Sequence, residues 1–219
     1  AISIEIYPLS QSDYALLGNA GVTGITIYQE TYQQEVYTHV HSGPKADFMA
    51  RLEAPERAAR AGYRELGIGS LIGLASPKLD LYLTAQHAAY LMKQYWRSQI
   101  SVSFPRLQNA EGAFEAAVQV SDRELAQAVF ALRMVLPDAD LVLSTREQPE
   151  FRDGMAGLGI TRMSAGSKTS PGAYAVASEN LDQFEVVDKR NPQQIAKMLE
   201  SKGLEPVWKD FDTGFLKVD

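Results

Sequence analysis

The sequence predicts an α/β protein built as an incomplete (β/α)8 TIM-type barrel with about six parallel strand–helix units. Short apolar runs alternate with helix-like segments along the chain, the pattern of consecutive βα units. Several apolar runs end in small hydroxyl or charged residues, as strands do at the catalytic rim of a barrel. A complete barrel takes about 250 residues, whereas this chain has 219 and opens on a strand pattern. We therefore expect two units to be missing.

Composition narrows the class of protein. The chain is 45% hydrophobic and 22% charged, which favours one globular domain over residues 1–219. A net charge of -6 argues against a nucleic-acid surface. The sequence has no apolar stretch long enough to span a membrane and no signal-peptide pattern, so we expect no membrane contact and a cytoplasmic location. The absence of cysteine excludes a disulfide or a cysteine-ligated metal centre within this chain.

The first strand–helix units follow from periodicity. Isoleucines alternate with other residues over 2–6 and predict a strand, and residues 25–28 predict a second one. Between them, residues 10–19 predict a helix with Leu16 and Leu17 facing inward.

The segment after the second strand is rich in turn-forming residues. We expect residues 38–45 to form a polar loop that leaves His39 and His41 in solvent. A helix over about 47–61 should follow, with Pro55 breaking or kinking it.

The remaining units have clear start and stop signals. A capping box begins a helix at Ser121, and Asn191 followed by proline begins the last helix, which Gly203 ends. The other expected elements are strands at 67–74, 100–104 and two within 141–174, and a helix at 80–99.

Four strand tips carry groups that could do chemistry. Glu30 follows the second strand, glycines interrupt the third, Ser144 and Arg146 follow the fifth, and Ser164 follows the sixth. A guanidinium suits an amino-acid carboxylate, a carboxylate or hydroxyl suits its ammonium, and bare backbone suits a flat ring. Each residue also has a simpler interpretation, as a surface ion pair or a turn former. Taken singly, they indicate only a binding site at a barrel rim.

Seven segments together resemble the 2-iminoacetate synthase family, the tyrosine lyases of thiamine biosynthesis. They keep the family's order along the whole chain. The segments are YQETY at 28–32, HSGPKADF at 41–48, GIGSLIGL at 67–74, SVSFPRL at 101–107, LSTRE at 143–147, MSAGSKTSPGAY at 163–174 and EPVWKDFD at 205–212.

The resemblance implies radical S-adenosylmethionine (SAM) chemistry. Members of this family hold a 4Fe-4S cluster on a CxxxCxxC loop and cleave SAM to a 5′-deoxyadenosyl radical. The radical takes hydrogen from tyrosine, and the Cα–Cβ bond breaks to give 2-iminoacetate and p-cresol. The implied cofactors are SAM and the 4Fe-4S cluster, and the implied partners are tyrosine and a thiazole synthase of the ThiG type.

The resemblance also assigns residues to roles. Glu30 looks like the acidic residue of the SAM site, and Arg51 looks like a partner for the SAM carboxylate, although Arg57 is close by. The strand that bears Gly69 and Gly73 is similar to the one that lies against the adenine. Three residues resemble the tyrosine site: Arg146 as the carboxylate ligand, with Ser144 and Ser164 as neighbouring hydroxyls.

The chain departs from the family pattern because it has no cysteine and no equivalent of the first two strands. We therefore expect a C-terminal piece of a tyrosine lyase that is inactive by itself. The alternative is a cluster-less, non-catalytic barrel that binds an amino acid or a thiazole synthase. A related lyase acting on another aromatic amino acid, such as tryptophan, also fits the pattern.

Overall fold

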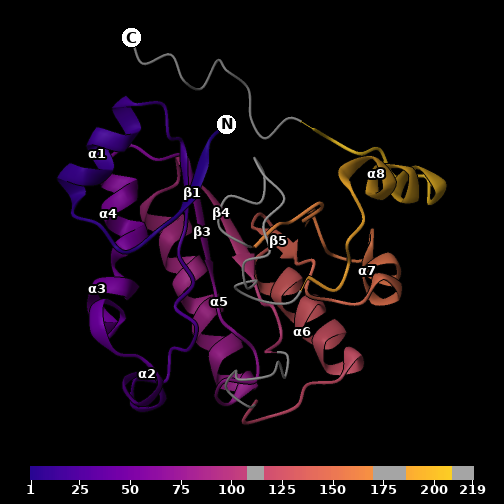
Figure 1. Cartoon of the computed structure of the whole chain (residues 1–219), viewed down its shortest axis with the longest axis horizontal. Coiled ribbons are helices and arrows are strands. Elements are labelled where there is room, and N and C mark those ends of the chain that lie inside the picture. Colours follow the sequence, from indigo (N-terminus) through magenta and orange to yellow (C-terminus); the bar gives the residue numbers. More distant parts are fainter. Residues whose placement is uncertain (108–115, 170–185, 209–219) are drawn as a thin grey trace.

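The fold is a curled sheet of six parallel strands with helices along its outer side (Figure 1). The computed structural model describes residues 1–107, 116–169 and 186–208. The strands pair in chain order, each with the next, and this half-barrel confirms the predicted fold class. They are β1 (Ser3–Glu5), β2 (Gly24–Thr26), β3 (Glu65–Gly69), β4 (Gln99–Ser103), β5 (Asp140–Leu143) and β6 (Arg162–Met163).

Helices connect the strands in the order expected of right-handed βα units. Among the described residues, no helix is both long enough and apolar enough to cross a membrane. The helices are α1 (Gln11–Asn19), α2 (Gln34–Val40), the 3-10 turn η1 (Gly43–Lys45), α3 (Phe48–Leu52), α4 (Ala54–Arg60), α5 (Pro77–Gln94), α6 (Asp122–Val135), α7 (Pro149–Met155) and α8 (Pro192–Ser201).

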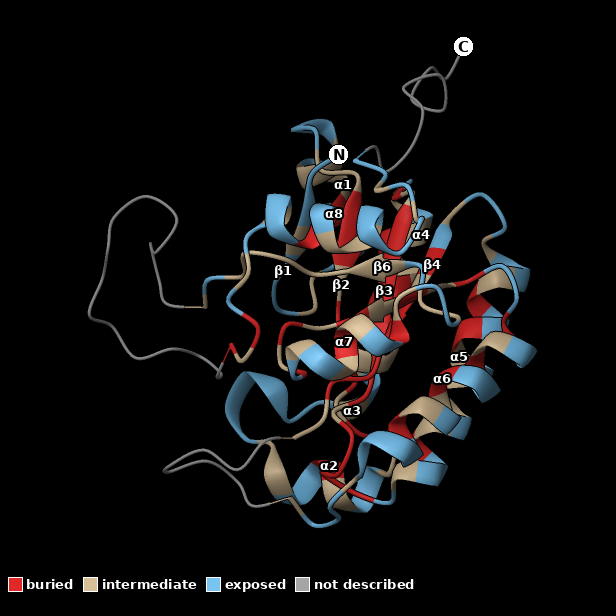
Figure 2. Ribbon diagram, turned by 90° about the vertical axis from the view of Figure 1, so that its right-hand side faces the viewer, coloured by how far each residue is buried: buried red, intermediate tan, exposed pale blue. Residues whose placement is uncertain are grey.

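The core lies between the sheet and its covering helices. All five residues of β3 are buried, as expected for a parallel strand with both faces covered. Figure 2 shows buried positions along the strands and exposed positions on the outer surfaces of α5 and α6. The apolar positions spaced along α6 and at its C-cap, Leu125, Val129, Leu132 and Leu136, are all buried.

The orientation of α1 differs from the prediction. Ser10 caps the helix, but Leu16 is 67% exposed and Tyr14 is the buried residue. Tyr14 packs edge-on against Tyr63, with ring centroids 5.7 Å apart. One aromatic ring thus sets which side of the helix faces inward, and the inward position predicted for Leu16 is wrong.

The expected polar loop at 38–45 is instead largely helical, formed by the end of α2 and by η1. Tyr37 on α2 is fully buried. Its hydroxyl donates to the Lys45 carbonyl at 2.6 Å, and its ring meets Phe48 edge-on. Burial of a single aromatic side chain outweighs the turn-forming composition, which is why the prediction failed.

The predicted start and stop signals of the other helices are confirmed. The helix expected over 47–61 is divided into α3 and α4 next to Pro55. Capping boxes open α6 at Ser121 and α8 at Asn191, and Gly203 follows α8 with a φ of 75°. Each of these signals depends on contacts within a few residues, so packing against distant elements does not change its effect.

The end of β3 is packed tightly against β4. A Cβ added to Gly69 would lie 2.1 Å from the backbone oxygen of Ser103 and 2.9 Å from the Tyr28 ring. Gly154, on α7, has nothing within 4 Å of the equivalent position. The chain itself therefore requires glycine at position 69.

Gly69→Ala should lower the free energy of unfolding by about 1–3 kcal/mol because strand backbone cannot move aside cheaply. Gly154→Ala should raise it by about 0.5–1 kcal/mol because alanine restricts the unfolded chain and favours helix. Urea unfolding of both variants measures the contrast. Equal stability of Gly69→Ala and the parent would contradict the packing argument.

Candidate binding site at the carboxyl edge of the sheet

The predicted site residues lie at or just beyond the carboxyl ends of the strands. Gly69 ends β3, Ser144 follows β5 and Ser164 follows β6. Glu30 lies beyond β2 and is bridged to Ser70, next to the end of β3. Because the strands are parallel, these positions share one edge of the sheet.

Glu30 is the centre of an ion-pair cluster. Its Oε1 lies 2.8 Å from the Arg51 guanidinium and 3.8 Å from Lys45 Nζ, and its Oε2 lies 2.8 Å from His41 Nε2. Arg51 also donates from Nε to the Tyr28 carbonyl at 2.6 Å. The structure thus joins two predicted residues, Glu30 and Arg51, and surrounds the carboxylate with cations.

The backbone at Glu30 is strained. Its φ is 69°, and it is the only non-glycine with a positive φ in the described ranges. Holding such a residue in the left-handed region costs on the order of 1–3 kcal/mol, and strain of this kind concentrates at functional sites. The strain marks Glu30 as a position whose conformation the surrounding structure enforces.

His41 was predicted to lie in a solvated loop, and that prediction is wrong. Its side chain is 5% exposed, stacked on the Tyr37 ring at 4.0 Å. Nδ1 lies 3.0 Å from the Tyr37 carbonyl, which can only accept, so Nδ1 carries a proton. His39, by contrast, is exposed. The spacing of four between Tyr37 and His41 on a helix is the sequence signal that was missed.

The glycines assigned to the adenine site have a role within the chain. Gly69 is required by β4. Gly73 has a φ of 101°, and a Cβ added there would lie 2.6 Å from the backbone oxygen of Val118. Both glycines are explained without a ligand, and their contact with adenine stays a prediction.

Arg146 follows the end of β5, and its backbone N–H donates to the Ser144 hydroxyl at 3.2 Å. Burial lowers the pKa of the guanidinium, whereas the nearby Tyr28, Glu5 and Glu30 act in the opposite direction. Arginine nevertheless stays protonated at neutral pH. Arg146 and the Glu30 cluster therefore share one electrostatic environment.

Glu5, at the end of β1, was not predicted as a site residue. It keeps exposed surface, yet neighbouring protein that displaces water raises the pKa of its carboxyl, against the charges of Arg146, Arg51 and Lys45. The alternating pattern at 2–6 was interpreted only as a strand. Its position at a strand tip was the signal available in the sequence.

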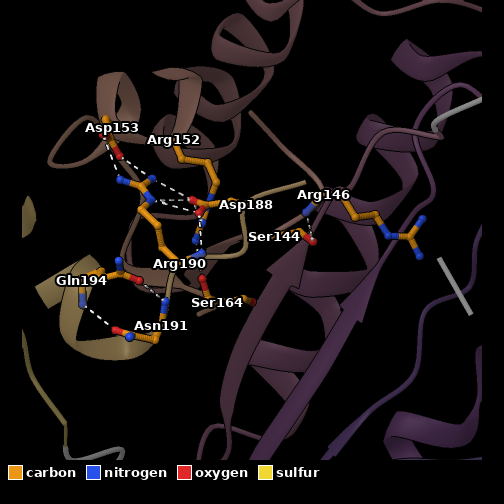
Figure 3. A network of polar contacts seen from close by, with 9 residues as sticks. All are labelled: Ser144, Arg146, Arg152, Asp153, Ser164, Asp188, Arg190, Asn191 and Gln194. Carbon is orange, nitrogen blue, oxygen red and sulfur yellow. Dashed lines mark hydrogen bonds and ion pairs between the residues drawn. The ribbon is translucent and has the colours of Figure 1, made fainter. Parts of the chain in front are cut away.

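Ser164 belongs to a different network (Figure 3). Its carbonyl accepts from Arg152, which is fully buried and ion-paired with the equally buried Asp188. Arg190 joins Asp188 to Asp153, at 2.7 Å from each. In Figure 3 the Arg146 side chain extends away from this group. The structure therefore brings Ser144 and Arg146 together and ties the Ser164 carbonyl to a separate, buried network.

Glu147, in the same strand-tip segment as Arg146, has a structural partner. It is 1% exposed and accepts from Arg106 Nε at 2.9 Å, while Arg106 also reaches Asp122 at 2.7 Å. Glu147 thus ties the end of β5 to the segment after β4.

A cavity of about 910 Å³ lies at the other edge of the sheet. Glu65, Gln99 and Asp140, which begin β3, β4 and β5, line it together with part of α8. The Glu30 cluster and Arg146 do not line this cavity, so its volume does not bear on the site described above.

The fold and the strand-tip groups define an incomplete (β/α)-barrel with charged residues at the carboxyl edge of its sheet. Residues 103–205 match the family model of the Biotin and Thiamin Synthesis associated domain. The chain is 44% identical over 97% of its length to 2-iminoacetate synthases of Salmonella typhimurium and Escherichia coli. It spans 57% of the length of these relatives.

Solved structures agree with this relationship. The FeFe-hydrogenase maturase HydG from Carboxydothermus hydrogenoformans has a TM-score of 0.82 and 36% identity, over 93% of this chain and 47% of its own. A second HydG structure has a TM-score of 0.86 and 34% identity, over 95% and 46%. The chain is therefore similar over almost its whole length to part of the 2-iminoacetate synthases and of HydG, and the resemblance inferred from its motifs is confirmed.

Asp188→Asn should destabilise the protein by about 3–5 kcal/mol at pH 7 because Arg152 loses its buried counter-charge. Burial alone would raise the pKa of the Asp188 carboxyl, but hydrogen bonds from Arg190 and the charge of Arg152 hold this pKa below its ordinary value. A lowered pKa stabilises the fold above the unfolded pKa of about 3.9 and ceases to do so as pH falls through the folded pKa.

The difference in stability between the parent and Asp188→Asn should therefore shrink below about pH 4. Urea unfolding between pH 7 and pH 2 measures it, with the exposed Asp138→Asn as control. A difference that stays constant over this range would contradict the assignment.

Proposed function

We propose that this chain supplies the SAM-binding and tyrosine-binding residues of a radical SAM tyrosine lyase of thiamine biosynthesis. The reaction would cleave the Cα–Cβ bond of tyrosine to give 2-iminoacetate and p-cresol. The observation that carries the proposal is the Glu30–Arg51–Lys45 cluster, with Arg146 in its electrostatic field. A thiazole synthase as acceptor of the product and a cytoplasmic location belong to the same proposal.

The residues around Glu30 suit the amino-acid end of SAM. A carboxylate that accepts from cations on several sides can also accept from the ribose hydroxyls or the ammonium of a ligand. Lys45 is 44% exposed and lies 3.8 Å from Glu30, so its flexible ammonium has room to turn toward a ligand carboxylate. Arg51 is 11% exposed and fixed by two hydrogen bonds.

Arg146 suits the carboxylate of tyrosine. A guanidinium can grip a carboxylate through two parallel hydrogen bonds, and partial burial strengthens such a pair by excluding water. Ser144 supports the turn that presents Arg146, since its hydroxyl accepts from the Arg146 amide. Ser164 would contribute through its hydroxyl, because its carbonyl is already engaged by Arg152.

A 4Fe-4S cluster does not fit the residues of this chain. Such clusters are held by cysteine thiolates, and the 219 residues include no cysteine. When bound, cluster and SAM would supply the radical chemistry, and the cluster ligands would have to come from outside this sequence. The chain's own contribution is to bind, to orient and to exclude water.

The lack of cysteine also favours a second candidate, a cluster-less barrel that binds an amino acid or a thiazole synthase. The two candidates differ in the natural reading frame. A tyrosine lyase requires a CxxxCxxC segment upstream of Ala1, whereas the second candidate requires a natural start near Ala1. A lyase for another aromatic amino acid would be recognised by its products.

Arg51→Ala should weaken SAM binding by about tenfold or more, because one charge-assisted hydrogen bond contributes about 1.5–3 kcal/mol. Equilibrium dialysis with labelled SAM on the natural full-length protein, anaerobically reconstituted with iron and sulfide, measures this change. Arg60→Ala, which removes an exposed arginine paired with Glu56 on α4, should bind as the parent does. Equal losses in both variants would contradict a specific role for Arg51.

Arg146→Ala should raise the KM for tyrosine by about tenfold or more, and Arg146→Lys should recover part of the loss, since lysine keeps the charge but not the fork. Formation of p-cresol by the reconstituted full-length protein measures both. Arg123→Ala, an exposed position on α6, is the control. An Arg146→Ala variant with the parent's KM would refute the carboxylate role.

A further inference from the structure

Side chains of helix α5 hydrogen-bond to the residues that follow the strained backbone at Glu30. Thr31 and Tyr32 follow Glu30 directly, and both donate to one oxygen of Asp80. The Thr31 hydroxyl lies 3.0 Å and the Tyr32 amide 2.9 Å from Asp80 Oδ1. Asp80 and Thr31 are both completely buried. A single carboxylate oxygen thus fixes the chain in the two residues after Glu30.

The same helix also holds the segment opposite Glu30. Thr84 Oγ1 donates to the Asp80 carbonyl at 2.7 Å and lies 2.6 Å from the hydroxyl of the buried Ser70. Ser70 is bridged to Glu30, and the Glu30 carbonyl accepts from the Leu71 amide at 2.8 Å. Helix α5 therefore contacts both the residues that follow Glu30 and the segment to which Glu30 is bridged.

A third contact comes from the middle of α5. The Tyr32 hydroxyl lies 2.8 Å from His87 Nδ1. Burial lowers the pKa of His87 to about 4, so the imidazole is neutral near pH 7 and its unprotonated nitrogen can accept from the hydroxyl. Both the backbone and the side chain of Tyr32 are thus bound to α5.

Asp80 is unusual among the buried ionisable side chains of the described chain. Arg152 and Asp188 form an ion pair, whereas no ion pair is found for Asp80 within the described ranges, where its partners are hydrogen-bond donors. Its Oδ2 is buried and has no hydrogen-bond partner among the described residues. Burying a carboxyl group costs free energy when one of its oxygens has no hydrogen-bond partner. This cost is explained if the other oxygen, Oδ1, fixes the position of the residues that it binds.

We propose that Asp80 is a positioning residue of the candidate site. By fixing Thr31 and Tyr32 through Oδ1, it enforces the left-handed backbone at Glu30 and so directs the Glu30 carboxylate toward Arg51 and His41. Asp80 acts through this segment and does not touch Glu30's carboxylate or its ligands. The consequence for SAM rests on the function proposed above.

Two substitutions of Asp80 test whether its hydrogen-bond acceptor, and not another property of the side chain, fixes Thr31 and Tyr32. Asp80→Asn keeps an oxygen for Thr31 and Tyr32 but places an amide nitrogen where Oδ2 has no partner, so it costs stability without releasing the segment. Asp80→Ala removes the acceptor. Val129→Ala, a cavity-forming change in α6, serves as the control for general destabilisation.

The direct reporter is hydrogen exchange at the Leu71 amide, which bonds to the Glu30 carbonyl and not to Asp80. In the natural full-length protein without ligand, Asp80→Ala should speed its exchange about tenfold or more, while Asp80→Asn and Val129→Ala should stay within about twofold of the parent. Unchanged exchange in Asp80→Ala, or equal acceleration in Val129→Ala, would overturn the proposal.

The second measurement is the affinity of the reconstituted full-length protein for SAM. It should fall about tenfold in Asp80→Ala and recover in Asp80→Asn; recovery would not accompany a merely structural role, since both variants lose stability. If Leu71 responds but the parent binds no SAM, the proposed function fails and the positioning role of Asp80 stands. If Leu71 responds, the parent binds SAM and Asp80→Ala binds it equally well, the link between Asp80 and the site is refuted.

Discussion

The left-handed backbone at Glu30 is the constraint on which the candidate site depends. A glutamate adopts that conformation only if neighbouring contacts offset the strain, and the structure provides them on every side. Leu71 holds the carbonyl, while Arg51 and His41 hold the carboxylate. An acceptor fixed in this way needs little reorganisation when a ligand arrives, and this preorganisation favours binding.

Two kinds of buried charge have different roles in this chain. Arg152 and Asp188 are both fully buried and pair with each other, and Arg152 also donates to the Ser164 carbonyl, so they hold the segment around residue 188 against the end of β6. The Glu30 carboxylate remains 23% exposed although several cations surround it. Full burial in a mutual ion pair indicates a structural role, and partial exposure with an excess of cations indicates a place for an anionic group.

Much of the fold could be predicted from the sequence because its signals are local. The capping boxes at Ser121 and Asn191 and the break at Pro55 depend on a few neighbouring residues. The helical structure of residues 34–45 depends on burial of the Tyr37 side chain, and the orientation of α1 depends on burial of the Tyr14 side chain. Those contacts link residues whose spatial relation no local pattern encodes.

The site shows the same division. Glu30, Arg51 and Arg146 could be named because motifs order them along the chain, and the structure places Glu30 against Arg51. His41, Glu5 and Asp80 were missed, since their roles arise from burial and from neighbours on other elements. In the described residues, Glu30 is held by Arg51, His41 and Leu71, whereas a cluster would need thiolates that the sequence lacks. The residues that orient Glu30 are therefore different from those that would supply the radical chemistry.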